Sequence, residues 1–503
     1  MFRNANWSGR LASAAIGAGL LAASTLSADV VALKAGTLHT GTGEPIENGI
    51  VIIEDGTIVA VGPGIPIPGD ATVYELEEGH ITAGLIDANA RLERQDIFLP
   101  EEARPAGDLS TFFVRQLSFH NDGAACVTCS GFAMCPLSSL HGEFKSGTDQ
   151  DLEEELGCPC CGWPSHNIAS ILTAGVQPAI TSTESSSEVV PHTSVLDVAN
   201  LRSSDYSWLA NSGVTTVFVA PDTSAVIGPQ GAIVTTYGRI RDRILNDSGD
   251  VQAVIGTDPY AVGLRNSRPF GQFVSSRTRR PTTRMGVAWV FRKAFADTQD
   301  WIAGQEVTGS DQPPAEAFPV LQKIMEGDVP LRILARDRND IEGAVRMAGE
   351  FDLKFTLVEP VAAYDCWEVL EQTRPEIVFG PISDSSVGLR RFSGDDNRTR
   401  LGTIRELFER GFEPALSAQD MRDEEGLAGQ AMLAIKAGVS FDQALRAVTV
   451  NPARVLGLSD QMGTVEVGKR GDVVLWTGKP FEATTKPAVV VVGGRVAMNE
   501  TDD

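Results

Sequence analysis

Six of the seven cysteines of this 503-residue chain lie between positions 126 and 161, in the pattern C-x2-C-x5-C, then 22 residues, then C-x-C-C. His120, His141 and His166 lie within or beside this stretch. Thiolates and imidazoles at such spacings could hold a structural zinc ion, whereas an even number of clustered cysteines could form disulfides. A redox role is a third interpretation. The clustered cysteines are Cys126, Cys129, Cys135, Cys158, Cys160 and Cys161.

The segment that carries these cysteines, residues 120–166, is rich in glycine and serine. So short a segment has little core of its own, and we therefore expect disulfides or a bound metal ion to stabilise it. The motif C-x-x-C-H does not occur in the sequence, so covalent haem attachment is not supported. The remaining cysteine, Cys366, falls in a helical pattern and is expected to be a small buried side chain.

The histidines are concentrated in the first part of the chain. There are six, and none follows position 192. The second half of the chain therefore cannot contribute an imidazole to a metal site or to acid–base catalysis. The histidines are His39, His80, His120, His141, His166 and His192.

The stretch Gly84–Leu92, GLIDANARL, is expected to be a turn that leads into a short buried strand. Side chains alternate along a strand, so Asn89 and Arg91, two residues apart, should point to the same side. A metal site would need lone-pair donors at such positions. Arginine stays protonated in proteins and has no lone pair to offer, so Arg91 cannot be a metal ligand.

The net charge of −24 argues against a nucleic-acid partner, which requires clustered lysine and arginine. Residues 1–28 have the features of a signal peptide. Arg3 and Arg10 precede or flank an apolar run of small residues at 11–26, and cleavage before Asp29 fits. An uncleaved anchor is the alternative, but the run is shorter than the ~20 apolar residues of a membrane span. We expect an exported protein, periplasmic or secreted, with no membrane span after cleavage.

Short strands are expected at both ends of the chain, and alternating strands and helices between them. Such βα units predict an α/β fold with a parallel sheet, and their number suits either a closed barrel or a doubly wound sheet. Asn339 is the expected N-cap of one helix. The expected strands are 30–34, 49–53, 57–61, 214–220, 354–358, 376–379, 413–416 and 489–492, and the expected helices are 204–212, 340–349, 362–372 and 400–410.

Several of these segments resemble the amidohydrolase superfamily, and its imidazolonepropionase-like subgroup in particular. The resemblance rests on GLIDANARL, on GVTTVFVAPDTSAVIGPQGAIV (213–234), on PTTRMGVAWVFRKAF (281–295) and on ALRAVTVNPARVLGL (444–458). It implies a TIM-type (β/α)8 barrel over residues 81–459, with the Cys-rich segment at about 120–166 as an insertion. Residues 29–80 and 460–500 would together form a small composite β-sandwich.

The resemblance also implies where a metal would be bound. Members of the superfamily hold one or two metal ions through an early H-x-H pair, later histidines and a final aspartate. None of these ligands is present at the matching positions, so we expect no metal in the barrel. The matching positions are Asn89, Arg91, Leu334, Arg336, Pro360 and Gln419.

Two interpretations of Arg91 and Arg336 remain open. Their guanidinium groups could bind an anionic ligand in place of a metal. Alternatively they could pair with nearby carboxylates, of which Glu359, Asp337 and Asp420 are candidates, and fill the mouth of the barrel.

The sequence therefore predicts an exported amidohydrolase-fold protein that has lost metal-dependent hydrolysis and acts as a binding or scaffold protein. One alternative is an active hydrolase of a non-peptide C–N bond that uses other ligands. A second is a redox or metal-carrying module in the Cys-rich segment, with zinc as the candidate ion. The expected partner is a small-molecule or protein ligand, and homodimerisation is expected by analogy alone.

Overall fold

The computed structural model describes residues 30–92, 187–246, 249–260, 280–309, 311–382, 395, 399–419 and 426–501. The predicted signal peptide, the Cys-rich segment with its six cysteines and Asp420 all lie outside these ranges, so those predictions are untested. No helix in the described ranges combines the length and the apolar character that a membrane span requires.

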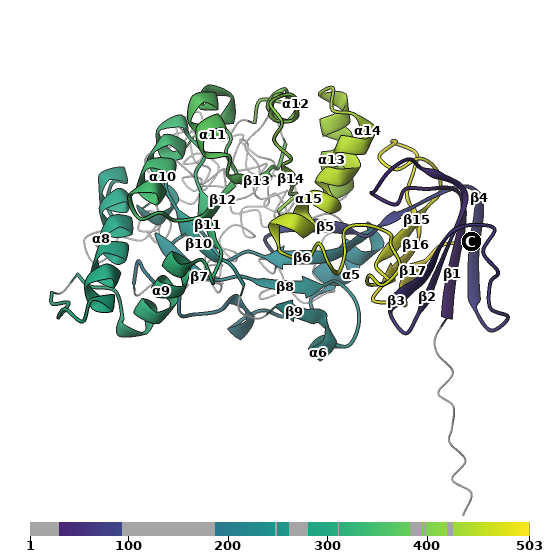
Figure 1. Ribbon diagram of the computed structural model, residues 1–503, viewed down its shortest axis with the longest axis horizontal. Helices are drawn as coiled ribbons and strands as arrows, with labels where there is room; N and C mark the ends of the chain where they lie inside the picture. The colour runs from purple at the N-terminus through teal and green to yellow at the C-terminus, as the bar shows by residue number, and fades with distance from the viewer. Residues whose placement is uncertain are drawn as a thin grey trace, which may run out of the picture.

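A seven-stranded sheet is built from both ends of the chain (Figure 1). β4 from the N-terminal part pairs with β15 from the C-terminal part in antiparallel register, Ile81 opposite Leu475. This pairing confirms that the two ends meet in space. The strands from the two ends form one continuous sheet. The composite β-sandwich, which would have two sheets, is therefore not confirmed. In spatial order the strands are β17 (Arg495–Asn499), β16 (Pro487–Val492), β15 (Val473–Trp476), β4 (Thr72–Ala83), β1 (Val30–Leu38), β2 (Ile46–Glu54) and β3 (Thr57–Pro63).

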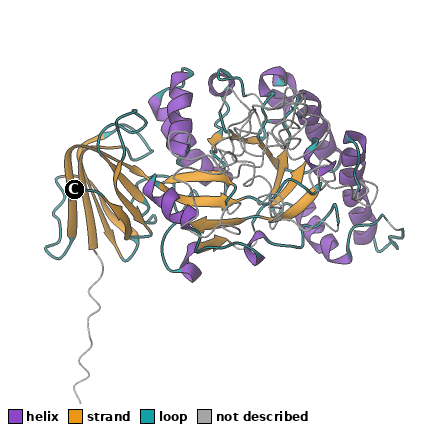
Figure 2. Cartoon of the chain, turned by 180° about the vertical axis from the view of Figure 1, so that it is seen from behind, coloured by secondary structure: helices purple, strands orange, loops and turns teal. Residues whose placement is uncertain are grey.

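The remaining strands form two further sheets, around which the helices gather, whereas the composite sheet forms an all-strand end of the molecule (Figure 2). One sheet has the order β14 (Ala415–Leu416), β13 (Glu376–Phe379), β12 (Phe355–Val358), β11 (Leu331–Leu334), β10 (Val251–Val254) and β7 (Ile227–Gln230). The other has the order β5 (Leu85–Ala90), β6 (Val214–Val219), β8 (Ala232–Thr235) and β9 (Ile244–Asn246). β10 to β14 are parallel, as the βα pattern predicted.

These two sheets do not close into a single hydrogen-bonded barrel within the described residues. They nevertheless share one apolar interior, to which eight strands each contribute at least one buried side chain. The mixed α/β fold is thus established, and the closed (β/α)8 barrel is not. The strand residues of this interior cluster are Ile86, Ala88, Phe218, Ile233, Val254, Leu334, Val358, Val378 and Ala415.

A buried carboxylate joins the ends of the two sheets. Asp87 of β5 accepts a hydrogen bond from the backbone N–H of Ala418, just beyond β14, at 2.9 Å, and another from the N–H of Asn89 at 2.9 Å. Burial raises the pKa of Asp87 above its usual range, although these donors and Ser417 act in the opposite direction. The side chain of Asp87 thus connects β5 to the end of β14, two strands that would pair through their backbones in a closed barrel.

The helices follow the expected alternation, with two differences. α10 begins at Arg338, so Asp337 and not Asn339 is its N-cap residue. The single helix expected at 362–372 is divided into a 3-10 turn, Ala363–Asp365, and α11, with Cys366 between them. Cys366 is buried as predicted, and burial raises the pKa of its thiol to about 12. The α-helices are α5 (Ser204–Asn211), α6 (Ile240–Arg243), α8 (Arg284–Ile302), α9 (Phe318–Glu326), α10 (Arg338–Glu350), α11 (Trp367–Thr373), α12 (Thr403–Glu409), α13 (Leu427–Lys436), α14 (Phe441–Ala447) and α15 (Val450–Val455), and two further 3-10 turns are Val195–Asp197 and Ala315–Ala317.

Gly84 is the junction between the composite sheet and the α/β part. A Cβ atom at this position would lie 2.2 Å from the hydroxyl oxygen of Thr215. The N–H of Gly84 donates to the carbonyl of Asp472, and the next residue, Leu85, donates to the carbonyl of Gly213. The close approach explains why the stretch Gly84–Leu92 begins with glycine.

Two histidines lie at the contact between the composite sheet and α14. Nε2 of His39 lies 2.9 Å from Nδ1 of His80, and the His39 ring packs 5.1 Å from that of Phe441. Burial lowers the pKa of His39 to about 4, and electrostatic repulsion from His80 and Lys479 contributes to the shift. Burial and Lys479 also lower the pKa of His80, whereas Glu482 opposes the shift. The pair is therefore neutral at pH 7.

We expect the free energy of unfolding to fall as the pH is lowered from about 6.5 towards 4. An unfolded histidine takes up a proton near pH 6.5, whereas folded His39 stays neutral until about 4, so its stabilising contribution is complete above pH 6.5 and declines below it. Denaturant titrations at a series of pH values measure this, with His39→Gln as the comparison. The variant should show a shallower decline over the same interval. Identical pH profiles for the two proteins would contradict this assignment.

Candidate functional site

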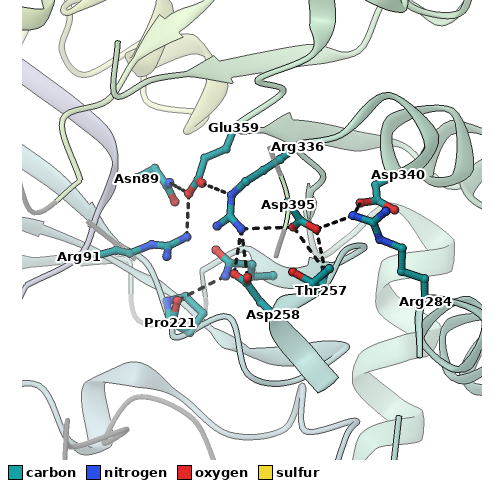
Figure 3. Close-up of polar contacts among 11 residues, drawn as sticks. Asn89, Arg91, Pro221, Thr257, Asp258, Arg284, Arg336, Asp340, Glu359 and Asp395 are labelled. Carbon is teal, nitrogen blue, oxygen red and sulfur yellow. Dashed lines mark hydrogen bonds and ion pairs between the residues drawn. The ribbon is translucent and has the colours of Figure 1, made fainter. Parts of the chain in front are cut away.

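The stretch Gly84–Leu92 contains β5, the short buried strand that was predicted, and every residue from Leu85 to Ala90 is buried. Asn89 and Arg91 lie at its C-terminal end with 0% and 5% of their surfaces exposed. Both side chains are directed towards one oxygen atom of Glu359 (Figure 3). The period of two along the strand thus correctly predicted that they share one side.

The strand β11 shows the same alternation. Leu331 and Ile333 pack in the outer core beneath the helices, whereas Leu334 joins the interior cluster. Two residues beyond it, Arg336 is fully buried and directed inwards, towards Glu359. Leu334 and Arg336 therefore occupy adjacent inward positions.

The carboxylate of Glu359 lies between two buried guanidinium groups (Figure 3). Its Oε1 is 2.8 Å from Nη2 of Arg91, and its Oε2 is 2.8 Å from Nε of Arg336. The amide Nδ2 of Asn89 approaches Oε1 at 3.4 Å. Glu359 itself is 1% exposed. One carboxylate thus compensates two cations that would otherwise repel each other in a site from which water is largely excluded.

The backbone directs Glu359 into this position. It follows β12 and has a φ of 55°, in the left-handed region that residues with a side chain seldom adopt. Its N–H donates to the carbonyl of Val378 at 2.9 Å, and its carbonyl accepts from Val361 at 2.7 Å. Gln419, beyond the end of β14, has a similar φ of 57°. Unusual backbone conformations therefore occur at two strand ends of the candidate site.

Arg336 is held by further carboxylates. Its Nη1 lies 3.0 and 3.1 Å from the two oxygens of Asp258, which follows β10, and 3.5 Å from Asp395. Burial alone would lower the pKa of Arg336, but Asp258, Glu359 and Asp395 outweigh it and raise the pKa above the usual value. The guanidinium is therefore permanently charged and paired on more than one edge.

The ion pairs continue to the start of α8. Nη2 of Arg284 contacts Asp337 and Asp395 at 2.6 Å each, and Asp340 at 3.2 Å. Burial raises the pKa of Asp340 to about 7; Arg284 counteracts the rise, and Asp395 and Asp337 add to it. In the described chain three arginines thus face five carboxylates, and a proton on Asp340 partly relieves the excess of negative charge. The arginines are Arg91, Arg284 and Arg336, and the carboxylates are Glu359, Asp258, Asp395, Asp337 and Asp340.

A further buried arginine lies deeper between the strands. Arg332 of β11 donates to the carbonyl of Ala88 at 2.5 Å and pairs with Asp250 at 3.2 Å. Its guanidinium carbon lies 4.2 Å from the ring centre of Phe218, a cation–π contact. Sequence reasoning did not identify Arg332. It fixes β5 against β10 and β11 and belongs to the support of the site.

The remaining predicted positions have different surroundings. Pro360 is buried and has no polar side-chain group, and Leu334 packs in the apolar interior. Gln419 is 3% exposed and lies beside β5, where its carbonyl accepts from the N–H of Arg91 at 3.3 Å. Asp337, a proposed partner for Arg91 or Arg336, pairs with Arg284 at the start of α8.

The residues at the expected metal positions do not fit a metal ion. Zinc sites use His, Cys or carboxylate ligands, and here Glu359 and Asp258, the carboxylates that contact Arg91 and Arg336, already pair with these arginines. The guanidinium groups of Arg91 and Arg336 would also repel a bound metal ion. A dication and one guanidinium charge 4 Å apart repel each other by about 8 kcal/mol at an effective dielectric constant of 20.

One other group of carboxylates in the described residues has metal-ligand spacing. Oxygens of Asp337, Asp340 and Asp395 lie within 4.8 Å of one another. Arg284 contacts all three, and its guanidinium supplies the positive charge there.

Four members of the ion-pair network were missed in the sequence, and one of them, Asp340, was noted only as the first residue of an expected helix. Asp258 lies just beyond the end of a buried parallel strand, which is the usual place for functional residues in barrels and could have drawn attention to it. Arg284 falls within a segment that was noted only for its family resemblance. Asp395 lies in a stretch with no strand or helix pattern, and no feature of the sequence indicated its role.

Comparisons with known proteins agree with the fold. The model of the amidohydrolase family matches residues 415–497. "Amidohydrolase tasK" of Hapsidospora irregularis is 24% identical over 318 residues, which cover 58% of this chain but only 31% of that protein. The chain thus spans about a third of this curated relative.

Solved structures include an amidohydrolase from Thermotoga maritima MSB8, with a TM-score of 0.66 and 22% identity, covering 93% of this chain and all of that one. The structure of A. niger ochratoxinase aligns over 93% of this chain and 95% of that one, with 14% identity and a TM-score of 0.42.

We expect the substitution Glu359→Gln to lower the free energy of unfolding by about 3–5 kcal/mol, because it leaves two buried guanidinium groups without their shared carboxylate. Denaturant titration measures the change. Glu371→Gln is the matched control: it makes the same chemical change at an exposed ion pair with Arg410, and should cost less than about 1 kcal/mol. Equal losses in the two variants would contradict a central role for Glu359.

Proposed function

We propose that this member of the amidohydrolase superfamily binds a ligand at the ends of its parallel strands and does not hold a hydrolytic metal there. The observation that carries the absence of a metal is the position of Glu359 between Arg91 and Arg336, which is the carboxylate pairing expected as the alternative to an anion site. Ligand binding is assigned to the donors of Arg91 that this pairing leaves without a partner in the described part of the chain. Arg91 and Arg336 stand at positions where the family resemblance implies metal ligands. Internal ion pairs there supply the charge balance that a bound cation would otherwise provide.

The wider proposal is an exported binding or scaffold protein. The interior cluster shared by the two sheets supports a barrel-like enclosure, and the ends of parallel strands are where such folds bind small molecules. Export rests on the predicted signal peptide, and a scaffold role or a homodimer rests on analogy with the fold.

One observation favours a second function, hydrolysis of a C–N bond with a different ligand set. Asp337, Asp340 and Asp395 have the spacing of metal ligands and lie beside the ion-paired centre. A metal ion there would have to displace Arg284, which contacts all three carboxylates. We therefore place this function second.

Metal analysis of the purified protein, combined with an assay on a panel of amides and cyclic amides, tests the proposal. After incubation with zinc or manganese and dialysis, we expect no metal beyond what the Cys-rich segment retains, and no chelator-sensitive hydrolysis. The double variant Cys126→Ser and Cys129→Ser separates metal bound by that segment from metal bound elsewhere.

The contrary result would be a stoichiometric metal ion that persists in the cysteine variant, together with hydrolysis that a chelator abolishes. If that metal were then lost in Asp340→Asn, the second function would replace the first.

A further inference from the structure

Several polar atoms at the ends of β5 and β14 are buried and have no hydrogen-bond partner in the described part of the chain. They belong to three residues, Asn89, Arg91 and Gln419, whose surfaces are 0%, 5% and 3% exposed. Nearly all buried polar atoms in folded proteins are hydrogen-bonded, so such a group requires an explanation. The atoms are Oδ1 of Asn89, Nε and Nη1 of Arg91, and Oε1 and Nε2 of Gln419.

These three residues are neighbours. The N–H of Arg91 donates to the backbone carbonyl of Gln419 at 3.3 Å, and the hydroxyl of Ser417 donates to the carbonyl of Asn89 at 3.2 Å. Asn89 and Arg91 also approach the same oxygen of Glu359. The unpartnered atoms are therefore held at one end of the fold by fixed backbone and by the Glu359 ion pairs.

Their chemistry selects a kind of ligand. Arg91 offers two cationic N–H donors, which form their strongest hydrogen bonds with negatively charged oxygen. The carbonyl oxygen of Asn89 requires a donor in return, and the amide of Gln419 can both donate and accept. A matching ligand combines a carboxylate with an O–H or N–H group.

The charge balance limits the ligand further. Arg91 and Arg336 are compensated by Glu359 and Asp258, so this inner group of four residues has no net charge. One additional negative charge can be placed beside Arg91. Arg91 lies at one end of the ion-pair network, and Asp395 and Asp340 lie at the other end (Figure 3). A dianion such as phosphate would put two charges next to the carboxylate of Glu359 and is disfavoured.

We infer that Asn89, Arg91 and Gln419 bind a small monocarboxylate that carries a hydroxyl or amino group next to its carboxylate. Arg91 binds the carboxylate, and Asn89 and Gln419 bind the neighbouring donor group. This inference rests on the proposed function, because a metal ion at the same strand ends would exclude it. It also assigns the two arginines different roles: Arg91 contacts the ligand, whereas Arg336 positions Glu359.

Binding of glycolate, acetate and acetamide to the purified full-length protein tests the inference, for example by ligand-observed NMR titration. Glycolate should bind saturably and displace acetate, and acetamide should bind at least tenfold more weakly than glycolate. Arg91→Lys keeps a positive charge beside Glu359 but loses the fixed N–H donors of the guanidinium group, and should weaken glycolate binding by tenfold or more.

Gln419→Met is the second variant, because it replaces a buried amide that has no partner with an apolar side chain of similar length. It should weaken glycolate more than acetate, and the melting temperature should not fall. That combination separates a binding role from a structural one.

Two outcomes would overturn the inference. Equal binding of acetamide and glycolate would show that Arg91 does not recognise charge, and absence of carboxylate binding would mean that water alone satisfies these atoms. Metal content measured on the same samples keeps the two proposals separate: a metal-free protein that binds no carboxylate refutes only this inference.

Discussion

The carboxylate of Glu359 is the interaction on which the candidate site depends. It compensates Arg91 on one side and Arg336 on the other, each at 2.8 Å, in a place where all three side chains are at most 5% exposed. Removing such a carboxylate would leave two like charges in a medium of low dielectric constant, where their repulsion is only weakly screened. The left-handed backbone conformation of Glu359 costs about 1–2 kcal/mol. This cost is consistent with a conformation that is kept because it directs the side chain towards the two arginines.

The surrounding fold keeps these charges in place without requiring a fully closed barrel. Arg332 joins β5, β10 and β11 through Ala88 and Asp250, and Asp87 joins β5 to the end of β14. Both are buried polar links between strands, in contact with the apolar interior to which eight strands contribute. A network of this kind contributes little net stability compared with apolar packing, but it strongly disfavours any arrangement in which one partner is missing.

The sequence predicted more of the fold than of the site. Spacing by two correctly placed Asn89 beside Arg91, because alternation in a strand depends only on local geometry. Glu359 was correctly named as a candidate partner of Arg91 or Arg336. The sequence could not show that this one carboxylate joins both arginines, since Glu359 is 268 residues from Arg91 and is directed inwards by an unusual φ. Asp258 and Asp395 were missed for the same reason: their partners are distant in the chain and no periodicity connects them.

The sequence also did not predict that the barrel strands form two separate sheets. The βα alternation that predicted parallel strands does not indicate whether the first and last strands pair. In the structure the connection between β5 and β14 is made partly by Asp87 and Ser417 side chains. The helix boundaries near Asp337 and Cys366 differ from expectation because caps are decided by one or two residues, where local preferences are weakest.

Anomalous X-ray diffraction from crystals grown with zinc would test the central claim most directly, because it locates bound metal independently of any activity. The ion-pair account predicts no anomalous peak within ligand distance of Asn89, Arg91, Arg336 or Glu359, and electron density that joins Glu359 to both arginines. A zinc peak at these strand ends, with Glu359 turned away from Arg91 to ligate the ion, would contradict it.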